Sequence, residues 1–200
     1  MADSRIQSRN RAAILEAGLE IFSRHGFRGA TLDQIAAEAG LSKPNLLYYF
    51  ASKEAIHRTL LLGLMDTWLD PIRRIDPQGE PLAELLAYVS RKMALTRQYP
   101  RESRLFANEI LQGAPHIADT LSAELKTLVD ALADQMQAWI DAGRLAPVDP
   151  HHTIISIWAL TQHYADFDVQ VRAVLDSDDP LDRAEAHVTQ LFQRLLQPVD

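Results

Sequence analysis

Residues 31–56 read TLDQIAAEAGLSKPNLLYYFASKEAI and contain the strongest local signals in the chain. Thr31 is a good helix N-cap, and Gln34, three residues later, completes the pattern of a capping box. Gly40 can adopt the left-handed conformation that ends a helix. Ser42 can cap a second short helix, in which Pro44 is tolerated because the first turn leaves its backbone N–H groups unpaired. Two short helices joined by a tight turn with glycine predict a helix-turn-helix.

The rest of the chain also has helical patterns, so we predict an all-α fold. Apolar residues recur at helical spacing from Ile14 to Phe22, and Gly26 ends that segment. Ser52 begins a long helix, which Pro71 kinks or ends. After the linker DPQGEP, which starts at Asp76, prolines separate the later helices. These are expected at residues 81–98, 101–112, 117–142, 151–169 and 181–197.

The composition is that of a soluble globular protein, with 47% hydrophobic and 24% charged residues. No apolar run is long enough to span a membrane. There are no cysteines, which excludes disulfides and thiolate metal sites. The start of the sequence, MADSRIQSRNRAAIL, lacks an apolar signal core. We therefore expect no export and a cytoplasmic location.

Charge is distributed unevenly along the chain. The formal net charge is −7, but residues 1–60 hold eight Lys/Arg against six Asp/Glu. Residues 61–200 hold twelve against 21. A basic head on an acidic body is compatible with nucleic-acid binding by the head alone.

The second helix of a helix-turn-helix enters the major groove of DNA. Here that helix begins SKPNLLYYF. Lys43 can reach a phosphate or a guanine edge, Asn45 has the amide geometry that pairs with adenine, and Leu46 can meet a thymine methyl. Tyr48 and Tyr49 can direct one hydroxyl at a phosphate while the other ring packs inward.

Other residues near this helix can add to a DNA interface. Lys53 suits a phosphate, and Arg5, Arg9 and Arg11 can form a basic arm. Phe50 is expected in the core. The alternative is that the aromatic residues belong only to the core and the lysines only to the solvated surface, which would leave the capped helices and flanking basic residues without a function.

The segment as a whole resembles the TetR family of bacterial transcriptional regulators. The matching motifs are GFRGAT (residues 26–31), IAAEAGLS (35–42), YYF (48–50) and SKE (52–54). The resemblance implies a TetR-like fold, with a three-helix DNA-binding head at residues 1–52 and a ligand-binding and dimerisation domain at 53–200. It also implies that Thr31 contacts a phosphate and that Pro44–Phe50 is the recognition helix. Pro44 and Asn45 depart from the small residues common in the family, so the operator sequence does not carry over.

Three later segments resemble the RutR-type members of that family, which sense the pyrimidine bases uracil and thymine. They are SRLFANEILQGAP (103–115), GRLAPVDP (143–150) and IWALTQHYADF (157–167). A flat ring edged with N–H and C=O groups needs apolar walls and an amide. Trp158 and Gln162 lie one helical turn apart and share a face. By this resemblance Trp68, Trp158 and Gln162 contact the effector, with Tyr164, Asp166, Ser103 and Arg104 as further polar groups near it.

The last helix carries a narrow apolar stripe, formed by Leu181, Ala184, Val188, Leu191 and Leu195. Such a stripe is typical of a helix–helix seam between two subunits, and packing onto the chain's own core explains it almost as well. A homodimer is favoured because paired heads can read two half-sites of palindromic double-stranded DNA.

Two other classes of protein fit less well. No phosphate loop, nucleophile elbow or carboxylate pair indicates an enzyme. His151, His152 and His163 with Asp149 and Asp166 do not have the spacing of metal ligands, so we predict no metal and no cofactor besides a small-molecule effector. A regulator of another hydrophobic effector, or a ligand-binding protein without a DNA role, remains the alternative.

Overall fold

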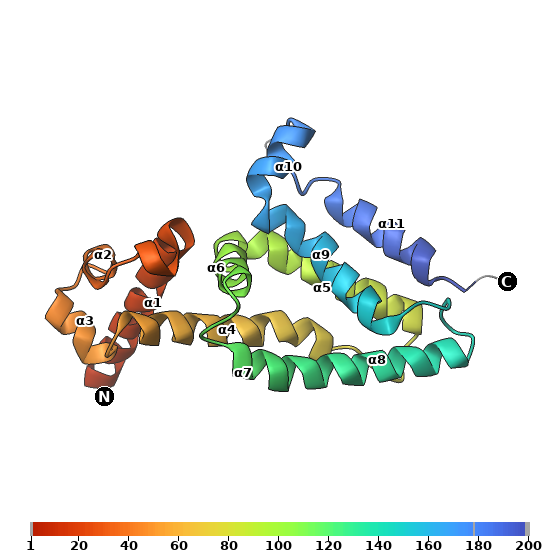
Figure 1. Cartoon of the computed structure of the whole chain (residues 1–200), viewed down its shortest axis with the longest axis horizontal. Helices are drawn as coiled ribbons and strands as arrows, with labels where there is room; N and C mark the ends of the chain where they lie inside the picture. Colours follow the sequence, from red (N-terminus) through yellow and green to blue (C-terminus); the bar gives the residue numbers. More distant parts are fainter. Residues whose placement is uncertain (1, 178, 199–200) are drawn as a thin grey trace. The chain divides into compact units, whose positions relative to one another are not determined.

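The computed structural model describes residues 2–177 and 179–198, and every regular element in those ranges is helical (Figure 1). The all-α prediction is therefore confirmed. The helices are α1 Ala2–Gly29, α2 Leu32–Glu38, α3 Lys43–Tyr49, α4 Lys53–Arg73, α5 Pro81–Gln98, α6 Pro100–Leu111, α7 Ala118–Thr120, the π-helix η1 Leu121–Leu125, α8 Lys126–Asp141, α9 Pro150–Asp166, α10 Asp168–Leu175 and α11 Ala184–Leu196. None of these helices combines the length and the apolar character that crossing a membrane requires.

The chain divides into two compact units. The first unit, which we call the head, comprises Met1–Asp66 and Arg104–Ala118. The second, which we call the body, comprises Thr67–Ser103 and Asp119–Asp200. The head is larger than the predicted domain of residues 1–52, because it includes most of α4 and α6.

The turn between α2 and α3 is closed by backbone bonds. Gly40 has a φ of 67°, its N–H donates to Ala37, and the N–H of Leu41 donates to Ala36. This pair of bonds is a Schellman motif, in which a left-handed residue lets the last carbonyls of a helix find donors. The side chain of Ser42 then accepts the N–H of Asn45 and caps α3.

The start of α2 has the predicted capping box. Thr31 Oγ1 accepts the backbone N–H of Gln34, while the Gln34 side chain accepts the backbone N–H of Thr31. The break at Gly26 is also as predicted, since its φ of 66° interrupts α1. The core of the head contains side chains without exposed surface from four helices, namely Ile14, Phe22, Ile35, Leu46, Ile56 and Leu61.

The body is built around α5. Helices α9 and α11 both pack against α5, and α8 packs against α9 (Figure 1). Tyr88 on α5, Met136 on α8, Ile157 on α9 and Phe192 on α11 are among the fully or almost fully buried residues of this core. The body therefore has a hydrophobic core of its own.

The apolar stripe of α11 divides between two environments. Ala184 and Val188 are buried in the core of the body, whereas Leu191 is 38% and Leu195 is 43% exposed. Packing onto the chain's own core is therefore the correct interpretation for Ala184 and Val188. Leu191 and Leu195 are exposed on the surface of the chain, which a helix–helix contact with another subunit would require.

Two of the expected helices are interrupted. The predicted helix at 117–142 consists of α7, the π-helical turn η1 and α8. The interruption is at Leu121–Leu125, where the backbone hydrogen bonds span five residues instead of four. The predicted helix at 151–169 ends at Asp166, and a separate helix, α10, follows it. Sequence periodicity did not predict α10.

Candidate functional site

The outer face of α3 is open to solvent in the head. Pro44 and Asn45 are exposed, and Tyr48 is 71% exposed. Lys43 is also exposed and forms a 2.9 Å ion pair with Asp33 on α2. A surface pair of this kind contributes at most about 1 kcal/mol, so Lys43 can exchange it for a phosphate at little cost.

Leu46 does not belong to this face. Its side chain has no exposed surface and lies in the core of the head, so the prediction of a thymine contact is wrong for Leu46. The neighbouring Leu47 is 40% exposed. Because α3 has only seven residues, its periodicity did not distinguish which leucine faces inward.

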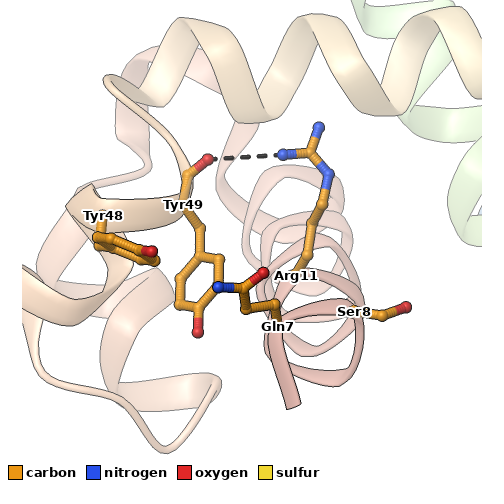
Figure 2. Close-up of a pocket in the computed structure, with 5 residues that line it drawn as sticks. All are labelled: Gln7, Ser8, Arg11, Tyr48 and Tyr49. Atoms are coloured by element: carbon orange, nitrogen blue, oxygen red, sulfur yellow. Dashed lines mark hydrogen bonds between the residues drawn. The ribbon is translucent and has the colours of Figure 1, made fainter. Parts of the chain in front are cut away.

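The end of α3 and the start of α1 border an open groove of about 360 Å³ (Figure 2). The groove is lined by Gln7, Ser8, Arg11, Tyr48 and Tyr49. The Arg11 guanidinium donates to the Tyr49 carbonyl at 3.5 Å, and Figure 2 shows this bond as a dashed line. All five side chains carry a hydrogen-bond donor, which is the composition expected of a surface that meets DNA phosphates.

Tyr48 and Tyr49 differ in exposure and in hydrogen bonding. Tyr49 is half-buried, and its hydroxyl accepts a 2.9 Å bond from the Asn10 side chain. The Tyr48 ring meets the Tyr49 ring edge-on at a centroid distance of 5.1 Å. Phe50 is buried, as expected, and the Arg11 guanidinium lies 4.3 Å from its ring centre. Arg11 therefore already has a structural position at the end of α3.

Lys53 also has structural partners. Its amino group donates to the carbonyls of Phe27 and Ala30, both at 2.8 Å, and lies 4.4 Å from the centre of the Phe27 ring. These bonds satisfy carbonyls near the end of α1, so the lysine joins the end of α1 to the start of α4. A phosphate contact by Lys53 stays a prediction, as does the one by Thr31, which is exposed at the start of α2.

In the body, Trp158 is half-buried on α9, and its indole N–H donates to the Tyr88 hydroxyl at 2.7 Å. Burial raises the pKa of Tyr88 to about 12, so the phenol stays protonated. Trp68 is 8% exposed, and its ring centre lies 6.2 Å from that of Tyr99. The two tryptophans thus lie among polar aromatic groups.

A polar pair made of the buried Ser103 and the half-buried Asp166 lies in the same unit. The Ser103 hydroxyl donates to the Asp166 carboxylate at 2.5 Å. Gln162 and Tyr164 are half-buried on α9. Arg104, the remaining predicted residue, belongs to the head by its contacts.

The sequence did not single out Lys92. It is 3% exposed on α5, and its amino group lies 6.0 Å from the centre of the Trp68 ring. Burial lowers the pKa of Lys92 to about 8, although the Asp166 charge acts in the opposite direction. A lysine within an apolar helix normally extends to solvent, so the sequence carried no signal for this residue.

Two family models match the chain. Residues 14–59 match the model for bacterial regulatory proteins of the tetR family, and residues 61–199 match the model for the C-terminal region of YcdC-like proteins. The chain belongs to the TetR family. It is a bacterial transcriptional regulator with a helix-turn-helix, as the motifs in residues 26–54 predict.

Among curated proteins, this TetR-family chain is similar to the HTH-type transcriptional regulator RutR of Escherichia coli strain K12. The two are 48% identical over 171 residues, which cover 86% of this chain and 81% of RutR. It is also 25% identical to the uncharacterized HTH-type transcriptional regulator YfiR of Bacillus subtilis, over 74% of each chain.

Solved structures show the same fold at low sequence identity. A TetR-family regulatory protein from Rhodococcus RHA1 has a TM-score of 0.78 at 19% identity, covering 96% of this chain and 98% of its own. AibR in complex with isovaleryl coenzyme A and operator DNA has a TM-score of 0.74 at 20% identity, covering 95% and 100%. The TetR-like fold class is thereby confirmed.

Proposed function

We propose that this TetR-family regulator is a homodimeric repressor that binds a partly palindromic operator and responds to a pyrimidine base such as uracil or thymine. The proposal of DNA binding rests on the exposed face of α3. Asn45 and Tyr48 lie on this face, whereas Leu46 is buried in the core of the head. We place its action in the cytoplasm, where operator DNA is accessible.

Base contact is assigned to Asn45 and backbone contact to Lys43, Tyr48 and Arg11. An Asn side chain can pair bidentately with adenine, and a good pair of this kind discriminates by about 1–3 kcal/mol. Charged and hydroxyl donors contact phosphates without reading sequence. The groove beside Tyr48 accordingly positions the head, while Asn45 reads the operator.

The DNA part is tested with an operator selected from random duplexes by the purified protein. Asn45→Ala should weaken binding to that operator about tenfold or more and leave nonspecific binding unchanged. Arg11→Ala should weaken binding to all sequences and reduce the slope of log K against log salt by about one. Asn108→Ala, an exposed asparagine on α6, is the matched control. Undiminished operator binding by Asn45→Ala would contradict the assignment.

The effector part rests on the two tryptophans of the body and on 48% identity to RutR. We assign Trp68 and Trp158 as walls of the effector site and Gln162 as the amide at its edge. Lys92, Tyr88 and Ser103 supply further buried polar groups, and Asp166 supplies a half-buried one. A ligand against Trp68 would displace α4, a helix that begins in the head directly after α3, and alter the spacing of about 34–36 Å that two half-sites require.

Thermal shifts with uracil, thymine and other nucleobases test this part. A ligand at 100 times its Kd adds about 2.7 kcal/mol of stability. Gln162→Ala should reduce the affinity for the active base at least tenfold, because the imide edge loses its partner. If the protein responds to other hydrophobic molecules and Gln162→Ala has no effect, the alternative of another effector is correct.

A further inference from the structure

Three side chains with metal-binding atoms meet inside the head. His57 comes from α4, Glu109 from α6 and His116 from the segment after α6, and their ligand atoms all lie within 4.8 Å of one another. The Nδ1 of His116 lies 3.0 Å from Glu109 Oε2, and the Nδ1 of His57 lies 4.0 Å from the same oxygen. Two imidazoles therefore face one carboxylate.

The backbone after α6 turns sharply to bring His116 back to Glu109. Gly113 and Ala114 both have positive φ, 88° and 55°. A left-handed conformation is unfavourable for alanine, so local strain is held here by the surrounding structure. The Glu109 carboxylate accepts the backbone N–H of His116 at 2.7 Å, and the Glu109 carbonyl accepts that of Ala114 at 2.9 Å. This geometry fixes both ligands.

His57 provides the independent indication of a ligand. The residue is 2% exposed, and its Nδ1 has no hydrogen-bond partner. A buried polar atom without a partner costs stability, which a bound cation would recover.

The side chains around the three residues leave one side of the cluster accessible to an ion. The rings of Phe22 and Phe27 each lie 4.8 Å from the His57 ring and exclude water there. Glu109 is 3% exposed, but the His116 side chain is 20% exposed. An ion can thus reach the cluster past His116, and a water molecule can complete its coordination.

We propose that His57, Glu109 and His116 bind a divalent transition-metal ion of the Zn²⁺ class, with water as the fourth ligand. Tetrahedral zinc with bonds of about 2.0–2.1 Å places its ligand atoms about 3.4 Å apart. The observed separations of 3.0 and 4.0 Å bracket that value. The nitrogen and oxygen ligands suit Zn²⁺, Co²⁺ or Ni²⁺ better than Mg²⁺, which takes oxygen ligands in an octahedron.

Such an ion would join α4 to α6 within the head. The competing interpretation is a buried His116–Glu109 hydrogen-bonded pair that needs no metal. The sequence could not indicate the site, because His57 and Glu109 are far apart in the chain and lack any metal-binding spacing.

The test uses the full chain without a histidine tag, freed of metal with EDTA. Calorimetric titration with ZnCl₂ should show one saturable site per chain, and MgCl₂ should show none. His116→Ala should weaken Zn²⁺ binding at least tenfold. His151→Ala is the matched control, since His151 is exposed and lies 3.2 Å from the Asp130 carboxylate. It should leave Zn²⁺ binding at the cluster unchanged.

Co²⁺ provides a second measurement that needs no variant. Bound to the intact protein, Co²⁺ should show the intense visible absorption of a tetrahedral site, and Zn²⁺ should displace it. Absence of saturable binding, an octahedral Co²⁺ spectrum, or equal Zn²⁺ affinity in a folded His116→Ala protein would each overturn the proposal. Folding of the variant is checked by its helical circular dichroism.

Discussion

Replacing Lys92 by methionine should stabilise the protein at neutral pH. Lys92 is 3% exposed, and burial lowers the pKa of its amino group from 10.5 to about 8. Each unit of pKa change corresponds to about 1.4 kcal/mol, so holding the charged form in the core costs about 3 kcal/mol below pH 8. That cost already includes the favourable interaction with the Asp166 charge, which Lys92→Met removes. We therefore expect a net gain of about 1–3 kcal/mol at pH 7.

The gain should depend on pH in a defined direction. Between pH 8 and 10.5 the folded state has released the proton of Lys92 while the unfolded state still holds it. The wild type therefore gains stability as the pH rises through this window, and the advantage of Lys92→Met shrinks. At pH 9.5 the advantage should be less than half of its value at pH 7.

Urea unfolding at pH 7 and pH 9.5, at one fixed protein concentration, measures both quantities. Lys126→Met is the control, because Lys126 forms an exposed i,i+4 pair with Asp130 and should change stability by no more than about 0.5 kcal/mol. A destabilised Lys92→Met, or an advantage that does not change with pH, would refute the argument that the buried charge is costly.

Three further predictions concern stability. Gly18→Ala should destabilise the head by about 1–3 kcal/mol, because the added Cβ would lie 2.8 Å from the Ile56 side chain of α4. Gly63→Ala, whose Cβ would meet nothing within 4 Å, should instead stabilise the protein by about 0.5–1 kcal/mol. Equal urea midpoints for the two variants would contradict this prediction. Thr31→Ala should cost about 1 kcal/mol through loss of the capping box, measured by the same unfolding curves. Trp158→Phe should cost about 1–3 kcal/mol by leaving the Tyr88 hydroxyl without its indole donor, and a double-mutant cycle with Tyr88→Phe should recover part of the loss; strict additivity would show that the bond contributes nothing.

Local signals predicted the head well. The capping box of Thr31 and Gln34, the cap at Ser42 and the left-handed Gly40 all act within a few residues, so the sequence carries them directly. The same is true of the break at Gly26. What these signals specify is where each short helix begins and ends.

Contacts between distant residues were harder to predict. The sequence predicted a phosphate contact for Lys53, which stays a prediction, but it did not predict the bonds of its amino group to carbonyls more than twenty residues earlier in the chain. Leu46 and Leu47 differ in burial because of how α3 packs, which propensity does not encode. Lys92 and the cluster at His57 depend on tertiary packing in the same way. The separate helix α10 escaped prediction because the break after Asp166 has no proline or glycine.

The two bonds of Lys53 have a consequence for how the head opens. Its amino group holds the carbonyls of Phe27 and Ala30, and the same residue is the first of α4. One side chain therefore ties the end of one helix to the beginning of another, and neither can fray without the other. Deuterium uptake by the backbone amides of residues 26–30 and 53–57 should then occur together, as a single cooperative event.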